Sequence, residues 1–270
     1  MIGVTGASGF IGAHLLSQLG DSGFVVDLRA LKTPEELSEF LRMRGCQTIV
    51  HLAGPLPGVP NADLVATELA QRVAGAVKML DKCHIVFSSS IRVHSRDEGV
   101  FSVNSKVAPF DAYGLGKANS EAVFLESATE THPVSILRIS SVQGIGVHGR
   151  AHGLVSVFAR QAATGGPITV MGDGGSIKDL VDIGVVLNEI QDCIDNPPTP
   201  SQIVPVGSGQ PTSVIELAKA VSQVSGAEVV HIQEDPNDLS GHVDCMPVEI
   251  DLQVMVEQAW RAVESEMGDA

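Results

Sequence analysis

Three glycines near the start of the chain place the tightest limit on its fold. Gly6, Gly9 and Gly12 recur every third residue, after an apolar run at residues 1–4 and before a stretch with helical apolar spacing at 13–19. A strand, a tight turn and a helix in this order let the backbone lie close to a pyrophosphate at the helix N-terminus. The stretch predicts a dinucleotide-binding turn; the alternative is a glycine-rich turn that binds nothing.

Strands and helices alternate over the first half of the chain, which predicts a parallel sheet with helices on both faces. We therefore expect an α/β fold with a Rossmann-like, doubly wound sheet, whose ligands lie at the carboxyl ends of the strands. The predicted strands cover residues 1–4, 24–26, 48–53, 84–87 and 134–138, and the helices between them cover residues 13–19, 34–44, 62–80 and 112–127.

The alternation loosens beyond about residue 142. Helices are predicted at 154–163, 213–225 and about 254–264, and strands at 167–170 and 202–206. We expect a dinucleotide-binding domain at 1–142 and a small substrate-binding region at 143–270. The two are interleaved, because a later strand and helix near 180–206 are expected to join the first domain.

Charge and composition exclude several classes of protein. The formal charge of −15 over 270 residues argues against nucleic acid as a partner, because that affinity rests on Lys and Arg. No apolar run is long enough to span a membrane, and no secretion signal opens the chain, so we expect a cytoplasmic protein. The cysteines have no close pair or metal-ligand spacing, which predicts free thiols and no metal site: Cys46, Cys83, Cys193 and Cys245.

A tyrosine and a lysine carry the chemistry that the sequence predicts. Tyr113 is the one tyrosine of the chain, and Lys117 lies four residues later on a predicted helix, so both share a face. A neighbouring ammonium favours the phenolate and lowers the pKa of the phenol, which makes it a usable acid or base. Three serines, Ser88 to Ser90, follow a predicted strand, so we expect one of their hydroxyls to point toward Tyr113 and Lys117.

These features occur together in a known family. The chain resembles extended short-chain dehydrogenases/reductases of the NAD(P)-dependent epimerase/dehydratase type, which act mostly on nucleotide sugars. The resemblance covers residues 1 to about 225. It is carried by the residues 5–12, 51–54, 87–90, 113–117, 136–138, 170–174, 178–179 and 207–209.

The resemblance implies roles for individual residues. Tyr113 is the catalytic acid/base, Lys117 lowers its pKa and holds the nicotinamide ribose, and Ser90 hydrogen-bonds the reacting sugar oxygen. Hydride then passes between a sugar carbon and the nicotinamide of NAD or NADP. Substrate contacts fall on Ser90, Arg150 and Lys178. Cofactor contacts fall on Gly6, Ser8, Gly9, Phe10, Ile11, Gly12, Asp27, Leu28, Leu52, Ala53, Gly54, Ser88, Tyr113 and Lys117.

Departures from the family pattern narrow the activity. Ile91 and Arg92 stand where dehydratases carry an acidic pair, which favours an epimerase; a ketosugar reductase and a non-catalytic NAD(P)-binding sensor or scaffold are the alternatives. Lys178 replaces an arginine expected on the diphosphate, and Arg138 is a further candidate phosphate partner. His94, in place of a usual tyrosine, is interpreted as a surface residue. The resemblance also implies a homodimer formed through the helices near 62–80 and 112–128.

The interval from Gly12 to His51 is shorter than in the family. It has room for one strand, at 24–26, where the family has two. We favour loss of the second strand and its helix, which removes the residue that distinguishes NAD from NADP. If Asp27 instead ends the second strand, its carboxylate accepts the ribose hydroxyls and favours NAD.

Overall fold

The computed structural model describes residues 1–233 and 238–268, and it divides into two compact units. The first unit contains residues 1–95, 103–139 and 187–205, and the second contains residues 96–102, 140–186 and 206–270. The assignment of the short segment 96–102 to the second unit differs from the expected division, which kept all residues up to 142 together. Within the described ranges, no helix is long and apolar enough to cross a membrane.

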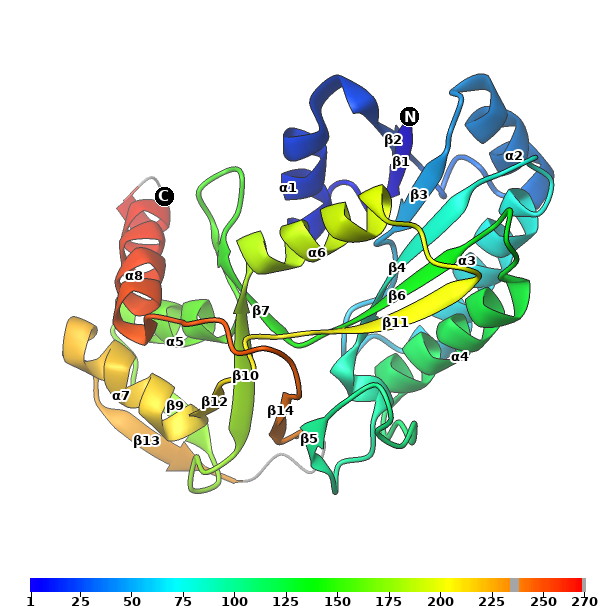
Figure 1. Ribbon diagram of the computed structural model, residues 1–270. Helices are drawn as coiled ribbons and strands as arrows, with labels where there is room; N and C mark the ends of the chain where they lie inside the picture. Colours follow the sequence, from blue (N-terminus) through cyan, green and yellow to red (C-terminus); the bar gives the residue numbers. More distant parts are fainter. Residues whose placement is uncertain (234–237, 269–270) are drawn as a thin grey trace. The chain divides into compact units, whose positions relative to one another are not determined.

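The first unit is built on a six-stranded parallel sheet, which confirms the Rossmann-like α/β fold (Figure 1). The order is β11-β6-β4-β3-β1-β2, and β1, β2, β3, β4 and β6 pair in parallel. The strands are β1 (Ile2–Thr5), β2 (Gly23–Val26), β3 (Thr48–His51), β4 (His84–Ser90), β6 (Val134–Ile139) and β11 (Ser201–Val206).

Helices cover both faces of this sheet (Figure 1). The helices α3 (Ala62–Val77) and α4 (Ala112–Ser127) pack together on one face, and α1 (Phe10–Leu19) and α6 (Ile183–Asp195) lie on the other. The helix α2 (Pro34–Met43) packs against α3. Apolar side chains from α2, α3 and α4 meet the sheet in one continuous buried core.

Local sequence signals explain where two helices begin. The Thr33 side chain accepts the Glu36 amide, and the Glu36 carboxylate accepts the Thr33 amide, so a capping box with Pro34 in the first turn starts α2. The Asp111 side chain accepts the Gly114 amide at 2.6 Å and starts α4, the helix that carries the tyrosine and the lysine.

The shortened interval after α1 contains one strand, as predicted, but the favoured loss of the second strand is wrong, because this strand occupies the second-strand position beside β1. β2 is the edge strand and pairs directly with β1, with Ile2 opposite Gly23 and Thr5 opposite Val26. Asp27 follows at the carboxyl end of the strand beside β1. This is the position that the ribose-binding interpretation of Asp27 requires.

In the second unit, the described residues form three small sheets, the helices α5, α7 and α8 and the first turn of α6. A four-stranded sheet has the order β12-β10-β7-β8, and two further pairs are β13–β9 and β14–β5. The helices α5, α7 and α8 pack on one another around an apolar core. The elements are β5 (Gly99–Phe101), β7 (Ser141–Ile145), β8 (Ala151–His152), α5 (Leu154–Ala163), β9 (Ile168–Met171), β10 (Ile177–Asp182), β12 (Pro211–Ser213), α7 (Val214–Ser225), β13 (Val229–Ile232), β14 (Gly241–Val243) and α8 (Leu252–Gly268).

Candidate active site

The glycine turn is closely packed against its own backbone. A Cβ at Gly12 would lie 2.3 Å from the Gly6 carbonyl oxygen, and Gly6 has a positive φ of 66° that favours glycine. α1 starts at Gly9 without a side-chain cap, and its first turn has no acidic residue. The helix N-terminus therefore keeps its positive end available for an anion.

Thr5 joins this turn to the end of β3. Its Oγ1 accepts the amides of Leu52 and Ala53, both at 3.1 Å, and lies 2.8 Å from His51 Nδ1. Since both lone pairs of the hydroxyl accept amides, its hydrogen points to Nδ1, and His51 carries its proton on Nε2. Burial and the Lys117 charge lower the pKa of His51 to about 3, which keeps the ring neutral.

The three serines lie within β4 instead of after it, and all three are buried. β4 runs to Ser90 because its last residues pair with residues 137–139 of β6. Ser88 Oγ donates to the His51 carbonyl at 3.3 Å, Ser89 Oγ donates to Glu121 at 2.5 Å, and Ser90 Oγ accepts the Arg92 amide at 3.3 Å. The three hydroxyls therefore have different partners.

Tyr113, Lys117 and Ser90 are brought together by α4 and β4. The Lys117 ammonium donates to the Ser88 carbonyl at 2.5 Å and lies 5.8 Å from the centre of the Tyr113 ring. The Ser90 side chain lies near the Tyr113 phenol and lowers its pKa. The structure thus links these predicted catalytic residues through direct contacts in the unit that holds the glycine turn.

The pKa of Tyr113 is raised, whereas the sequence predicted that Lys117 would lower it. Burial raises the pKa of the phenol, and this effect outweighs the Ser90 side chain and the Arg92 charge, which lower it. Lys117 directs its ammonium to a carbonyl rather than to the phenol, so the expected lowering by Lys117 is absent from this arrangement. Burial lowers the pKa of Lys117 to about 8, and the Glu121 carboxylate opposes that shift.

The other predicted cofactor residues surround the carboxyl ends of β1, β2 and β3. Ser8, Gly54 and Asp27 are exposed, and Leu28 is buried with its carbonyl accepting Arg72 Nη1 at 2.7 Å. The Asp27 carboxylate accepts the Arg29 amide and Nε, and these hydrogen bonds lower the pKa of Asp27. Phe10 and Ile11 are half-buried at the start of α1.

The predicted phosphate partners have varied surroundings. Lys178 is half-buried in β10, pairs with Asp238 and donates to the Leu239 carbonyl at 2.6 Å. Arg150 is exposed in the loop between β7 and β8. Arg138 is buried and ion-paired with Glu121 at 2.8 Å, so its interpretation as a phosphate partner is wrong.

His94 is also corrected by the structure, since it is 1% exposed and therefore not a surface residue. It lies after the short helix at Ile91–Val93 and forms an antiparallel bridge with Val107. The pairing of these two segments encloses a side chain that the sequence pattern placed outside.

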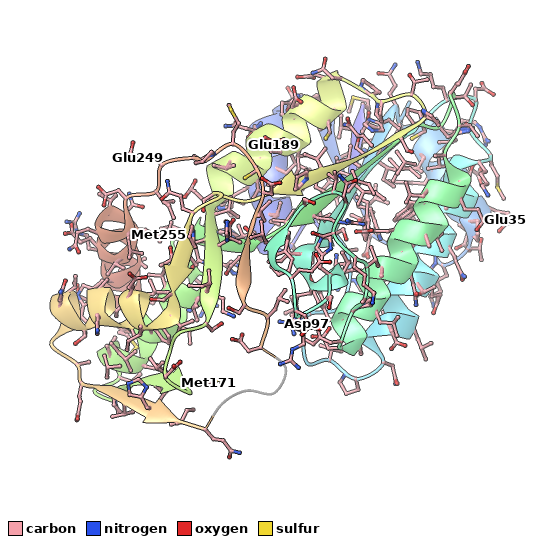
Figure 2. The ribbon with its side chains drawn as sticks, turned by 60° about the horizontal axis from the view of Figure 1, so that its bottom comes forward. Glu35, Asp97, Met171, Glu189, Glu249 and Met255 are labelled. Carbon is pink, nitrogen blue, oxygen red and sulfur yellow. The ribbon has the colours of Figure 1, made fainter. Side chains whose placement is uncertain are left out.

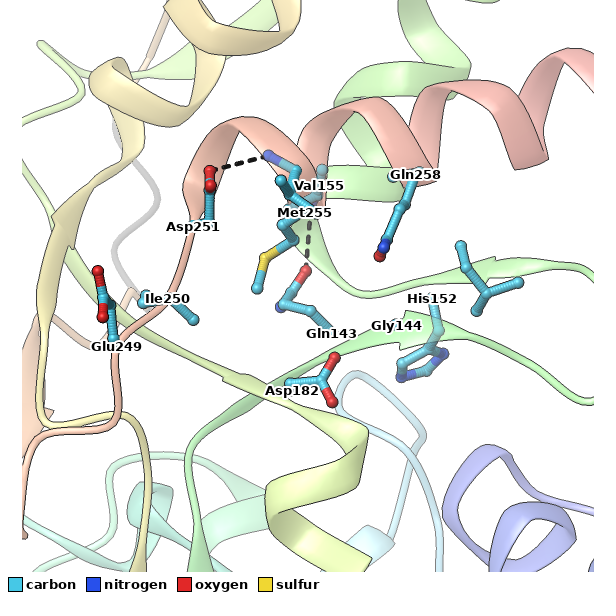
Figure 3. A pocket seen from close by; sticks show the side chains of 13 residues that line it. Gln143, Gly144, His152, Val155, Asp182, Glu249, Ile250, Asp251, Met255 and Gln258 are labelled. Atoms are coloured by element: carbon cyan, nitrogen blue, oxygen red, sulfur yellow. Dashed lines mark hydrogen bonds between the residues drawn. The ribbon is translucent and has the colours of Figure 1, made fainter.

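A pocket of about 240 Å³ lies within the second unit (Figure 3). Its walls are the β7–β8 hairpin, Asp182 at the end of β10, and the start of α8, where Met255 lies. Glu249 lies on the segment before α8 (Figure 2). Neither Arg150 nor Lys178 lines this pocket. Among the described residues, no group of three or more His, Cys, Asp or Glu side chains is arranged to hold a metal ion.

A Rossmann-like sheet, an uncapped glycine turn and a contacting Ser-Tyr-Lys set together define a dinucleotide-dependent enzyme of the short-chain dehydrogenase/reductase class. The family model of the NAD dependent epimerase/dehydratase family matches residues 2–188. The chain therefore belongs to this family of NAD-dependent enzymes.

Individual relatives share only about a quarter of their aligned residues with this chain. A protein described as an uncharacterized UDP-glucose epimerase, YtcB, of Bacillus subtilis is 25% identical over 83% of this chain and 81% of its own length. A UDP-glucose 4-epimerase of Vibrio cholerae is 23% identical over 81% of this chain and 74% of its own. The solved structure of MoeE5 with UDP-glucose and NAD superposes with a TM-score of 0.85 at 23% identity, covering 98% of this chain and 99% of MoeE5.

Proposed function

We propose that the chain is an NAD-dependent epimerase of a nucleotide-activated sugar, with Tyr113 as its acid/base. The observation that carries the proposal is the contact of Ser90 with Tyr113, and of Lys117 with the Tyr113 ring, at the carboxyl end of β4. The relatives named as UDP-glucose epimerases support this choice of substrate class.

The structure fits a bound dinucleotide. The uncapped start of α1 and the close backbone at Gly6 and Gly12 suit the pyrophosphate. We assign the adenosine side to Asp27 and Leu28, the phosphates to the glycine turn with its residues Ser8, Phe10 and Ile11, and the nicotinamide side to Lys117 and Ser88. The segment Leu52 to Gly54 completes the set. When bound, the nicotinamide accepts and returns a hydride.

The protein side chains move and hold the proton. Tyr113 takes the proton of the sugar hydroxyl that is oxidised and returns it when the carbonyl is reduced. Ser90 hydrogen-bonds the same sugar oxygen and orients it to the phenol. Burial raises the pKa of Tyr113, so the phenolate needs a nearby cation. We assign this role to Lys117, whose ammonium must turn from the Ser88 carbonyl to the phenolate to fill it.

The second unit is assigned to the sugar nucleotide. Arg150 is exposed and suited to a phosphate, whereas Lys178 must leave Asp238 before it can bind one. Ile91 after Ser90 places no acid beside the sugar, which favours epimerisation over dehydration. We further infer a homodimer, because α3 and α4 leave Leu64, Val65 and Leu115 exposed on their surface.

Mass spectrometry of small molecules released from the purified, denatured protein tests the proposal. We expect NAD, and interconversion of two 4-epimers in a panel of nucleotide sugars without added cofactor. Turnover that needs added NAD(P)H and yields a reduced sugar would instead identify a ketosugar reductase. Tight NAD binding without turnover across the panel would identify a sensor or scaffold.

A further inference from the structure

Glu121 lies on the same stripe of α4 as the two catalytic candidates. Tyr113, Lys117 and Glu121 are spaced four residues apart, so they follow one another along one helix face. Glu121 is 4% exposed, which is rare for a carboxylate unless it is paired. Its surroundings therefore need an explanation.

The Glu121 carboxylate joins α4 to two neighbouring strands. Oε1 accepts Ser89 Oγ at 2.5 Å and Arg138 Nε at 3.1 Å, and Oε2 accepts Arg138 Nη2 at 2.8 Å. Ser89 and Arg138 are paired residues of β4 and β6. One side chain thus connects the helix to adjacent positions of the sheet through charge-assisted bonds.

These contacts hold the part of β4 that leads to Ser90. Lys117 holds the Ser88 carbonyl, and one helical turn later Glu121 holds the Ser89 hydroxyl. Two consecutive residues of β4 are therefore fixed by α4, and the next residue along the strand is Ser90. We propose that Glu121, held by Arg138, is a positioning residue that fixes the strand end carrying Ser90 and keeps the ammonium of Lys117 in place for the proposed epimerisation.

The charges around Lys117 give this role a measurable consequence. The titratable groups around it are Tyr113 and Glu121 from α4, His51 from β3 and, through Glu121, Arg138 from β6. His51 is kept neutral by burial and by Lys117 itself. Glu121 is the anion that opposes the burial-driven fall in the pKa of Lys117, so its loss lowers that pKa further.

The experiment compares Glu121→Gln with Arg138→Gln. Protein labelled with ¹³C at lysine Cε is titrated by NMR; the chain has seven lysines, and Lys117→Arg assigns the signal of interest. We expect Glu121→Gln to lower the Lys117 pKa by about one unit, and Arg138→Gln to raise it, since a cation is removed. Glu126→Gln removes the same charge from the exposed side of α4 and is expected to leave the titration unchanged.

A purely structural ion pair predicts a different outcome. Both variants would then lose stability to a similar extent, with the Lys117 titration matching that of Glu126→Gln, and this result would overturn the proposal. Either variant suffices if the other does not fold, because the expected shifts have opposite signs.

This inference rests on the proposed function, but an experiment can contradict either one without contradicting the other. The titration needs no substrate, so a wild-type protein that turns over no nucleotide sugar leaves the NMR result interpretable. With a substrate, Glu121→Gln should lower kcat at pH 8 about tenfold with KM unchanged, and should move the alkaline limit of activity to lower pH. An unchanged pH profile would contradict the positioning role.

Discussion

Thr5 and His51 are 2.8 Å apart across the β1–β3 pair, with the Thr5 hydroxyl donating to Nδ1 of the neutral ring. The same hydroxyl accepts the two amides that follow β3. A single buried side chain therefore ties the strand before the glycine turn to the segment Leu52–Ala53, which we assign to the cofactor.

Replacing Thr5 with valine keeps the shape and removes these bonds. The Leu52 and Ala53 amides lose their acceptor, so we expect a loss of about 2–4 kcal/mol in the free energy of unfolding. Chemical denaturation measures it. Thr67→Val, whose hydroxyl bonds only a carbonyl of its own helix, is the control and should cost less than about 1 kcal/mol. Equal losses in the two variants would show that the Thr5 bonds contribute nothing specific.

Acid is expected to destabilise the first unit through its buried histidines. Burial lowers the pKa of His84 to about 4, below that of an unfolded histidine, so the unfolded chain binds the proton first. The contribution of the neutral His84 to the free energy of unfolding is therefore fully present above about pH 6.5. It is lost as the pH falls toward 4. His84→Gln should reduce that loss by on the order of 2 kcal/mol, measured by urea unfolding at pH 7 and pH 4.5. A variant with the wild-type pH dependence would contradict this assignment.

The phenol of Tyr113 is predicted to be required for turnover. Tyr113→Phe removes the acid/base while keeping the ring against Lys117, so we expect kcat to fall at least about 100-fold. Thermal unfolding should shift by only a few degrees, because the ring that packs in the fold is retained. Activity within about twofold of wild type would remove Tyr113 from the mechanism.

Asp27 is predicted to select the cofactor. It directly follows the strand beside β1 and is exposed, which suits a carboxylate that accepts ribose hydroxyls. Asp27→Ser should weaken NAD binding about tenfold and reduce the ratio of the NAD affinity to the NADP affinity, both measured by calorimetry. Glu35→Gln, an exposed acid at the start of α2, is the control. Unchanged affinity for both cofactors in Asp27→Ser would favour the view that no residue here distinguishes them.

Local signals predicted the helices of the first unit well. Residues 34–44, 62–80 and 112–127 were expected to be helical, and α2, α3 and α4 begin at the expected residues. Caps explain two of these starts, at Thr33 and Asp111, because a side chain that bonds its own helix acts over three residues. The predicted ends are less accurate, since α3 stops at Val77.

Partners distant in the sequence were harder to predict. Glu121 shares a helix face with Tyr113 and Lys117, but no local signal marks that face as buried. Its bonds to Ser89 and Arg138 depend on the register of β4 and β6. Likewise, β5 pairs with β14 about 140 residues later, and this pairing groups residues 96–102 with the second unit.

The sequence by itself determined the glycine turn, the alternation of strands and helices, and the Tyr113–Lys117 spacing, because each depends on residues that are neighbours in the chain. Tertiary structure alone decided that β4 extends through Ser90, that Arg138 pairs with Glu121, and that burial raises the pKa of Tyr113. These features arise from desolvation and from contacts between separate elements. Neither is encoded in local spacing.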